Sequence, residues 1–191
     1  MKEKKADVII LAAGLSSRFP GFKPLFKLNS KTIIENIIDN LSGICFNIIV
    51  VCGYKADVME IVLKKYDNVQ TVINKNYSDG MFSSILAGIK YVKAESFFVI
   101  PSDMPLVKEE TYNTLLESEG DIIIPSYEGK KGHPVLMNSK FIPELLVKKS
   151  NSNFSEFIKK KIFNLAEVND PGILIDIDTE EDLKNINSLN L

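Results

Sequence analysis

Short apolar runs alternate along the chain with longer segments in which apolar residues recur every three or four positions. The short runs predict strands at 7–11, 47–52, 69–73, 97–100 and 121–125. The longer segments predict helices over 33–41, 58–65 and 85–92. Such an alternation is typical of a mostly parallel sheet covered by helices. We therefore predict an α/β fold of three layers, α/β/α, with residues 1–191 forming a single Rossmann-like domain.

Several of these helices have candidate capping residues. Thr32 or Ser30 could cap the first helix, and Ser78 or Asp79 could cap the third. Near the end of the chain, Thr179 precedes a run of acidic residues that predicts a last helix, because the helix dipole favours negative charge in the first turn.

The alternation becomes less regular after residue 127. A glycine-containing turn at 128–132 leads into a short apolar run at 135–137. We expect this excursion to form a small subsheet or lid attached to the main sheet. Residues 140–165 then have a helical pattern.

Composition places the protein among ordinary globular proteins. Its 191 residues are 45% hydrophobic and 25% charged, and the formal net charge of -2 provides no general attraction to nucleic acid or to an anionic membrane. We expect neither as a partner. No apolar run approaches the roughly 20 residues of a membrane span, and the two cysteines, Cys45 and Cys52, are expected to be reduced core residues. These features predict a cytoplasmic protein.

Charge is distributed unevenly between the two ends of the chain. Residues 1–31 contain seven Lys and Arg against two Asp and Glu, whereas residues 167–191 contain one Lys against seven Asp and Glu. If the fold brings the two ends together, the cations could hold phosphate and the carboxylates could hold Mg²⁺. Otherwise, they are two solvated surfaces.

The end of the first predicted strand is rich in small residues. In an open parallel sheet, ligands bind at the carboxyl ends of strands, and here the sequence LAAGLSSR occupies positions 11–18. Small residues let the backbone approach a ligand, and successive N–H groups in such a turn bind anions. Arg18 and Lys23 are the cations that would close over phosphates. The sequence matches neither the dinucleotide-binding nor the P-loop pattern, and a plain turn with surface cations is the alternative.

These residues resemble the opening motif of the MobA-like nucleotidyltransferases, L-A-[AG]-G-x-S-x-R. Four further matches follow in the order of that family: DGMFSSI at 79–85, PSDMP at 101–105, GHPVL at 132–136 and DIDTEEDL at 176–183. One departure is Pro20, where the family usually has Gly. The resemblance implies a GT-A-like nucleotidyltransferase fold and the transfer of a nucleotidyl group from an NTP to a phosphorylated acceptor, with release of pyrophosphate.

The resemblance also implies a set of site residues. The residues it implies for nucleotide binding are Leu11, Ala12, Ala13, Gly14, Ser16, Lys23, Gly80, Ser84 and Asp103. It implies catalytic roles for Arg18, Lys23 and Asp103, Mg²⁺ ligation by Asp103 and Asp178 with Asp176 in reserve, and an acceptor-side position for His133. Two carboxylates suffice, because Mg²⁺ prefers a few carboxylates together with phosphate oxygens.

For each of these residues a structural role is the alternative. Asp103 could cap a turn, Asp178 could be an acidic residue at a helix start, and Ser83 or Ser84 could cap a helix. A lone histidine such as His133 is more often structural than catalytic.

The base and the acceptor are predicted from the resemblance. Cytidylyl members tend to have LAAG at the opening where guanylyl members have LAGG, so Ala13 favours CTP. The implied acceptor is molybdopterin or molybdenum cofactor, with a molybdoenzyme as a possible partner. The alternatives are a GTP-dependent guanylyltransferase of the same family and a nucleotidyltransferase acting on another sugar or alcohol phosphate.

Two other functional classes fit the sequence less well. A glycosyltransferase would normally have Asp-x-Asp where this chain has Ser102-Asp103-Met104. A non-catalytic nucleotide-binding module would be expected to lose Lys23 or an aspartate, and these residues are present.

Overall fold

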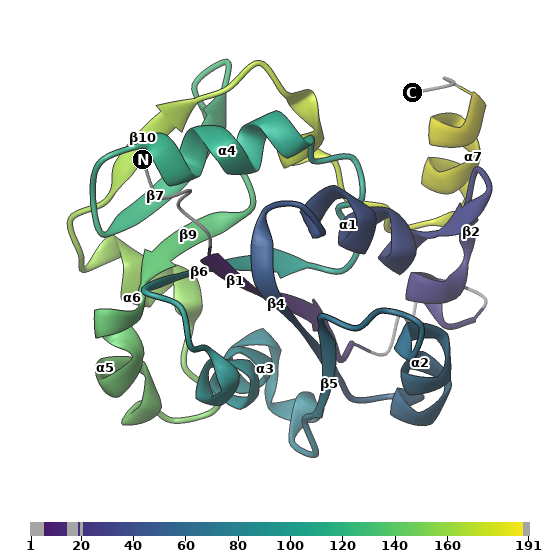
Figure 1. Ribbon diagram of the computed structural model, residues 1–191, viewed down its shortest axis with the longest axis horizontal. Coiled ribbons are helices and arrows are strands. Elements are labelled where there is room, and N and C mark those ends of the chain that lie inside the picture. Colours follow the sequence, from purple (N-terminus) through teal and green to yellow (C-terminus); the bar gives the residue numbers. More distant parts are fainter. Residues whose placement is uncertain (1–5, 15–18, 20, 189–191) are drawn as a thin grey trace.

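The computed structural model describes residues 6–14, 19 and 21–188 and contains an eight-stranded sheet with the order β10–β7–β9–β6–β1–β4–β5, in which β8 pairs with β7 (Figure 1). The strands of this sheet are β1 (Ala6–Ala12), β4 (Cys45–Cys52), β5 (Val69–Ile73), β6 (Ser96–Pro101), β7 (Ile122–Tyr127), β8 (Lys130–Lys131), β9 (Val135–Asn138) and β10 (Asn164–Glu167). The five predicted strands correspond to β1, β4, β5, β6 and β7. The structure thus confirms a mostly parallel sheet.

Helices cover both faces of the sheet. They are α1 (Ile33–Leu41), α2 (Ala56–Leu63), α3 (Met81–Gly88), α4 (Glu109–Glu117), α5 (Ile142–Leu146), α6 (Phe154–Lys159) and α7 (Glu180–Ser188). Helices α1, α2 and α4 pack on one face, and α3, α5 and α6 on the other. Figure 1 shows α4 and α1 on the opposite side of the strands from α3 and α5. The predicted three-layer α/β/α architecture is therefore correct.

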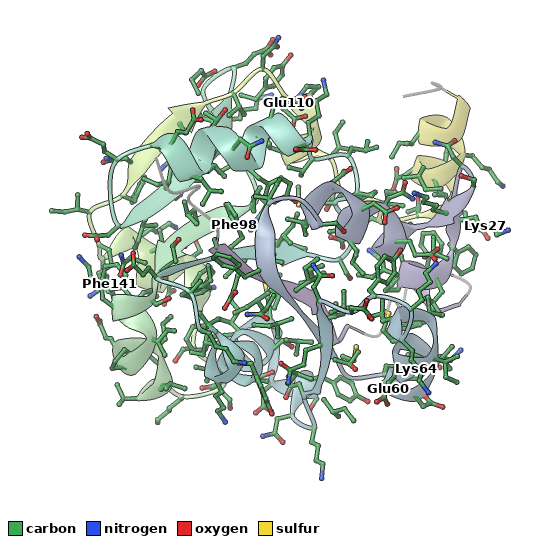
Figure 2. The ribbon with its side chains drawn as sticks, viewed as in Figure 1. Lys27, Glu60, Lys64, Phe98, Glu110 and Phe141 are labelled. Atoms are coloured by element: carbon green, nitrogen blue, oxygen red, sulfur yellow. The ribbon has the colours of Figure 1, made fainter. Side chains whose placement is uncertain are left out.

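The side chains of β1 explain why both faces need a cover. Val8 and Ile10 belong to the core under α1 and α4, whereas Ile9 and Leu11 belong to the core under α3. Successive side chains of a strand point to opposite faces of the sheet. A strand that is apolar throughout must therefore be covered on both faces. Phe98 of β6 is fully buried and packs edge to face on Tyr112 of α4, and Figure 2 shows it in the interior.

The excursion after residue 127 is part of the main sheet itself, so the prediction of a small subsheet or lid attached to that sheet is wrong. Strand β9 lies between β6 and β7 and runs antiparallel to both. Its residues Val135 and Met137 are as buried as those of the parallel strands. Because β9 is antiparallel, its beginning lies at the edge where the parallel strands end, and Val135 pairs with Val99 near the end of β6.

Three shorter predictions need correction. Residues 140–165 form two short helices, α5 and α6, and the start of β10, so the helical pattern there is interrupted. Helix α3 begins at Met81 after Gly80, with no side-chain cap, so neither Ser78 nor Asp79 caps it. The hairpin of β2 (Lys27–Leu28) and β3 (Lys31–Thr32) was not predicted.

Two other end signals are confirmed. Thr32 caps α1 and forms a capping box with Glu35. Thr179 Oγ accepts a hydrogen bond from Asp182 N at the start of α7. Cys45 and Cys52 are both buried, and no disulfide joins them. Within the described residues, no helix has the length and apolar character of a membrane-spanning segment.

The chain reverses its direction of strand addition next to β1. From β1 it adds β4 and β5 on one side, and then returns to β6 on the other side. The loops that leave β1 and β6 therefore diverge, and a crevice opens at the carboxyl ends of these two strands. The fold places the residues after Ala12 and after Pro101 on either side of that crevice.

The cap of α1 predicts a pH dependence of stability. Burial by itself would raise the pKa of Glu35, but hydrogen bonds from Lys65 and Thr32 outweigh it and lower the pKa from 4.5 to about 2. The stabilisation is therefore complete above pH 4.5 and is lost as the pH falls towards 2. We expect Glu35→Gln to lower the free energy of unfolding at pH 7 but to match the wild type near pH 2, as measured by urea denaturation.

The exposed Glu60 of α2, at the periphery in Figure 2, provides the control. Glu60→Gln should follow the wild type at every pH. A constant difference between Glu35→Gln and the wild type from pH 7 to pH 2 would contradict the prediction.

Candidate active site

A cavity of about 350 Å³ lies at the crevice between the ends of β1 and β6. Its lining includes nine of the predicted site residues: Leu11, Ala12, Ala13, Gly14, Lys23, Gly80, Ser84, Asp103 and Asp178. Tyr77, Met81 and Ser102 are among the further lining residues. The predicted Ser16 and Arg18 lie outside the described residues. Segments that are distant in the sequence thus meet at the edge of the sheet where ligands of this fold class bind.

Lys23 lies between the two predicted metal ligands. Its Nζ donates a hydrogen bond to Asp103 Oδ2 at 2.8 Å and another to Asp178 Oδ1 at 3.3 Å. The Lys23 side chain is 11% exposed, against 24% for Asp103 and 29% for Asp178. The basic start and the acidic end of the chain therefore do meet, as the uneven charge distribution suggested.

Backbone contacts fix both aspartates. Ile177 N donates to Asp103 O at 2.8 Å, which ties the C-terminal segment to the turn after β6. Asp178 N and Thr179 N both donate to Asp182 Oδ2, at 3.0 and 2.8 Å. The hydrogen bonds that Asp182 accepts from Thr179 and Asp178 lower the pKa of its carboxyl group. This carboxylate therefore stays ionised and satisfies the two backbone N–H groups just before α7. Asp178 therefore lies directly before Thr179, whose hydroxyl caps α7, and the Asp178 carboxylate accepts the hydrogen bond from Lys23.

Asn74 organises the opposite wall and was missed by the sequence analysis. Its buried amide nitrogen donates to Ser83 Oγ at 2.8 Å and to Ser84 Oγ at 3.0 Å. Its Oδ1 accepts from Asn76 N at 2.9 Å. Asn74 directly follows β5, so its position at the carboxyl end of a strand was a usable signal. Ser83 donates back to the carbonyl groups of Asn76 and Gly80, so neither serine caps α3.

The backbone comes close to the cavity at three glycines. Gly80 has a φ of +99°, which favours glycine, and allows the chain to turn from the Tyr77–Asp79 3₁₀ helix into α3. Gly53, after β4, packs so closely that a Cβ would lie 2.7 Å from the Tyr77 ring and 2.8 Å from Ala13 O. A Cβ on Gly14, which lines the cavity, would have no atom within 4 Å.

His133 lines a second cavity and not the one around Lys23. The two cavities share Gly80 and Met81, so His133 lies beside the candidate site, as the resemblance implied. Its backbone N donates to Ile173 O at 3.0 Å, and burial lowers the pKa of its imidazole, which is therefore neutral at pH 7.

The carboxylate oxygens around Lys23 suit a hard cation such as Mg²⁺ that is also bound by the phosphate oxygens of its substrate. In the part of the chain that the structure describes, no group of three or more His, Cys, Asp and Glu side chains could hold a metal ion. The carboxylates of Asp103 and Asp178 both contact the ammonium group of Lys23. Mg²⁺ is commonly bound by one or two such carboxylates together with phosphate oxygens. Asp176, the reserve ligand, does not line the cavity.

A model of the MobA-like NTP transferase domain family matches residues 8–165. The chain belongs to this family. The matched range contains β1, Lys23, Asn74 and Asp103, and it ends before Asp178. A MobA-like NTP transferase is a nucleotidyltransferase, and among the described residues the cavity lining includes the ammonium group of Lys23 and the carboxylates of Asp103 and Asp178.

Relatives of this MobA-like chain act on molybdenum cofactor, according to their names. Molybdenum cofactor cytidylyltransferase of Escherichia coli is 28% identical over 177 residues, which are 92% of each protein. A probable molybdenum cofactor guanylyltransferase of Bacillus cereus is 30% identical over 128 residues, 64% of this chain and 62% of that protein. Among solved structures, a nucleotidyl transferase of Methanothermobacter has the same fold, with a TM-score of 0.81 at 22% identity over 96% of each chain.

The close packing at Gly53 leads to a testable prediction for this MobA-like site. In Gly53→Ala the new methyl group displaces Tyr77 and the Ala13 carbonyl, so we expect a loss of about 1–3 kcal/mol in stability. Nucleotide binding should weaken as well, because both displaced groups line the cavity. Urea denaturation and calorimetric titration with nucleoside triphosphate measure the two effects. Gly43→Ala, where nothing lies within 4 Å of the Cβ, is the control, and equal behaviour of the two variants would refute the argument.

Proposed function

We propose that the protein transfers CMP from CTP to the phosphate of a molybdopterin-type acceptor and releases pyrophosphate. The observation that carries this proposal is the convergence of Lys23, Asp103 and Asp178 on one cavity, next to the small residues that follow β1. The family and the names of its relatives support the reaction class.

The reaction needs charge neutralisation and alignment more than a protein nucleophile. An oxygen of the acceptor phosphate attacks the α-phosphorus of CTP, a new P–O bond forms, and the bond from that phosphorus to the oxygen bridging to the β-phosphate breaks. Pyrophosphate leaves with that electron pair. Because the attacking phosphate is already ionised, no general base is required.

The described residues around the cavity would have different roles in the reaction. The ammonium of Lys23 neutralises negative charge on the phosphates, and the backbone N–H groups near Gly14 can bind a phosphate oxygen. Asp103 and Asp178 would hold Mg²⁺, which supplies charge neutralisation at the phosphates when bound. Lys23 must then exchange its carboxylate partners for phosphate oxygens, which its flexible side chain permits.

Cytosine is favoured over guanine by one residue and one comparison. Ala13 lines the cavity and adds a methyl group where guanylyl members tend to have Gly, which leaves less room for a purine. The cytidylyltransferase relative also matches over 92% of the chain, whereas the guanylyltransferase relative matches over 64%. We therefore take CTP as the nucleotide.

Removal of Asp103 tests the reaction. We expect Asp103→Ala to lower the rate of pyrophosphate release from CTP, Mg²⁺ and molybdenum cofactor by at least about 100-fold, a loss similar to those caused by deleting a group that stabilises transition-state charge. Asp67→Ala, an exposed residue that lines no described cavity, is the control and should retain full activity. A fully active Asp103→Ala would rule out the proposed site.

Replacement of Ala13 tests the choice of base. Ala13→Gly should shift the ratio of kcat/KM for CTP to that for GTP towards GTP by about tenfold, because one methyl group in a pocket discriminates by roughly 10–200-fold. Pyrophosphate release with each nucleotide gives the ratio. An unchanged ratio would show that Ala13 does not select the base, and use of GTP alone by the wild type would overturn the assignment of CTP.

A further inference from the structure

Strand β5 forms one edge of the main sheet, and its outer side is open. In the described part of the chain, β5 pairs with β4 alone and in a regular register. Its sequence, VQTVI at 69–73, contains no charge and no proline, which are common ways of protecting an edge strand. At the opposite edge of the sheet, β10 ends in the charged Glu167. The unprotected edge is therefore that of β5.

The backbone groups that face the open side of β5 belong to alternate residues. On either side of these residues, Asn68 O accepts a hydrogen bond from β4 at 2.9 Å, and Asn74 N donates one to β4 at 2.8 Å. Neighbouring residues of a strand direct their N–H and C=O groups to opposite sides. Val69, Thr71 and Ile73 therefore direct theirs to the open edge. Among the described residues, the N–H groups of Thr71 and Ile73 have no strand to pair with.

A third cavity, of about 430 Å³, lies between α2 and this edge. Its lining includes Ile61 and Leu63 of α2 and Val69 of β5. Ile61 is 75% exposed, and Ile73 is 60% exposed although its side chain lies on the same face of β5 as that of Val69. The edge therefore has an apolar recess at one end of β5 and a projecting apolar side chain at the other.

These features complement each other when a second copy is related to the first by a two-fold axis at Thr71. In the antiparallel pair that results, Thr71 lies opposite Thr71 of the second copy, and Val69 lies opposite Ile73 of the second copy. Each Ile73 would then enter the recess beside the other copy's Val69, and a cross-strand Thr–Thr pair is itself stabilising. A second copy would thus satisfy the free backbone groups and fill the third cavity.

The charges beside the third cavity also fit a second copy. Glu60 and Lys64 lie one turn apart on α2, both line the cavity, and both are exposed, as Figure 2 shows. The two-fold axis reverses the direction of α2, so Glu60 of each copy faces Lys64 of the other. Exposed ion pairs add little affinity, but they select the partner and the register. A partner with charges of a single sign would instead meet a like charge.

We propose that the protein forms a symmetric dimer in which the β5 strands of two copies pair antiparallel and join the two sheets into one. Ile73 of each copy fills the third cavity of the other, and Glu60 and Lys64 pair across the axis. Among the described residues, those of β5 and α2 line neither the cavity around Lys23 nor the second cavity, so the dimer leaves both accessible.

The mass of the full chain in solution tests the dimer. Sedimentation equilibrium of the wild type should show a mass that rises with concentration from 21.4 kDa to twice that value. Thr71→Lys places two like charges opposite each other at the axis and should weaken the dimer by at least about 100-fold. Leu165→Lys, at an exposed position of β10 on the opposite edge, is the matched control and should dimerise as the wild type does. Circular dichroism checks that both variants are folded.

Charge reversal in α2 tests the contact between copies without altering β5. Glu60→Lys and Lys64→Glu each place like charges across the axis, so each should dimerise about tenfold more weakly at low salt. Mixed in equal amounts, the two variants should form a heterodimer as tight as the wild-type dimer, because every pair across the axis is then of opposite charge. Damage to α2 itself would not be repaired by mixing, so a mixture that stays as weak as its components would refute the predicted pairing.

Amide hydrogen exchange locates the interface. The N–H groups of residues 71 and 73 should exchange slowly in the wild-type dimer and rapidly in Thr71→Lys. Slow exchange there in a monomeric wild type would show that a segment of the same chain covers the edge, and the dimer would be wrong. It would also be wrong if the wild type stayed monomeric up to about 100 μM, because the edge would then be open in solution. Disruption by Leu165→Lys but not by Thr71→Lys would place the interface at β10 instead.

Discussion

The hydrogen bonds of the Lys23 ammonium to Asp103 and Asp178 hold the candidate active site together. They join residues that are 80 and 155 positions apart, one after β6 and the other before α7. A partly buried ion pair adds little net stability, because desolvation offsets most of the attraction. Two carboxylates so close to each other would repel without a cation. The arrangement is therefore what the proposed function expects: a site in which Lys23 would compensate the two carboxylates until a triphosphate and its metal ion bind.

The C-terminal segment needs its own support to bring Asp178 to this position. Buried Asp170 accepts hydrogen bonds from Lys108 N and Thr111 Oγ, at 2.9 and 2.7 Å. A Cβ on Gly172 would lie 2.2 Å from the Leu106 carbonyl oxygen, and one on Gly132 would lie 2.2 Å from the Ile173 carbonyl oxygen. The segment is thus fixed between the loop after β6 and the turn before β9. The same contacts that place Asp178 in the first cavity also place His133 in the second.

The amino-acid sequence predicts the local structure well because local structure depends on side-chain periodicity. The five apolar runs became strands, and Thr32 caps α1 through the reciprocal bonds that its spacing from Glu35 permits. The place of β9 could not be predicted, because the short apolar run at 135–137 does not specify which strands it pairs with or in which direction. Ser78 and Asp79 failed as caps, since they belong to a 3₁₀ helix and Gly80 occupies the position before α3.

The candidate site was predictable to the extent that it follows from strand ends and motifs. Nine predicted residues line one cavity, yet Asn74 was overlooked although it too follows a strand. The second cavity was beyond sequence reasoning because it depends on the direction of β9. A parallel strand in that position would have begun at the opposite edge of the sheet, and the turn with His133 would have been far from Asp103. The antiparallel insertion is what brings the second cavity, with Ile124, Val135 and Lys131 in its lining, next to the cavity around Lys23.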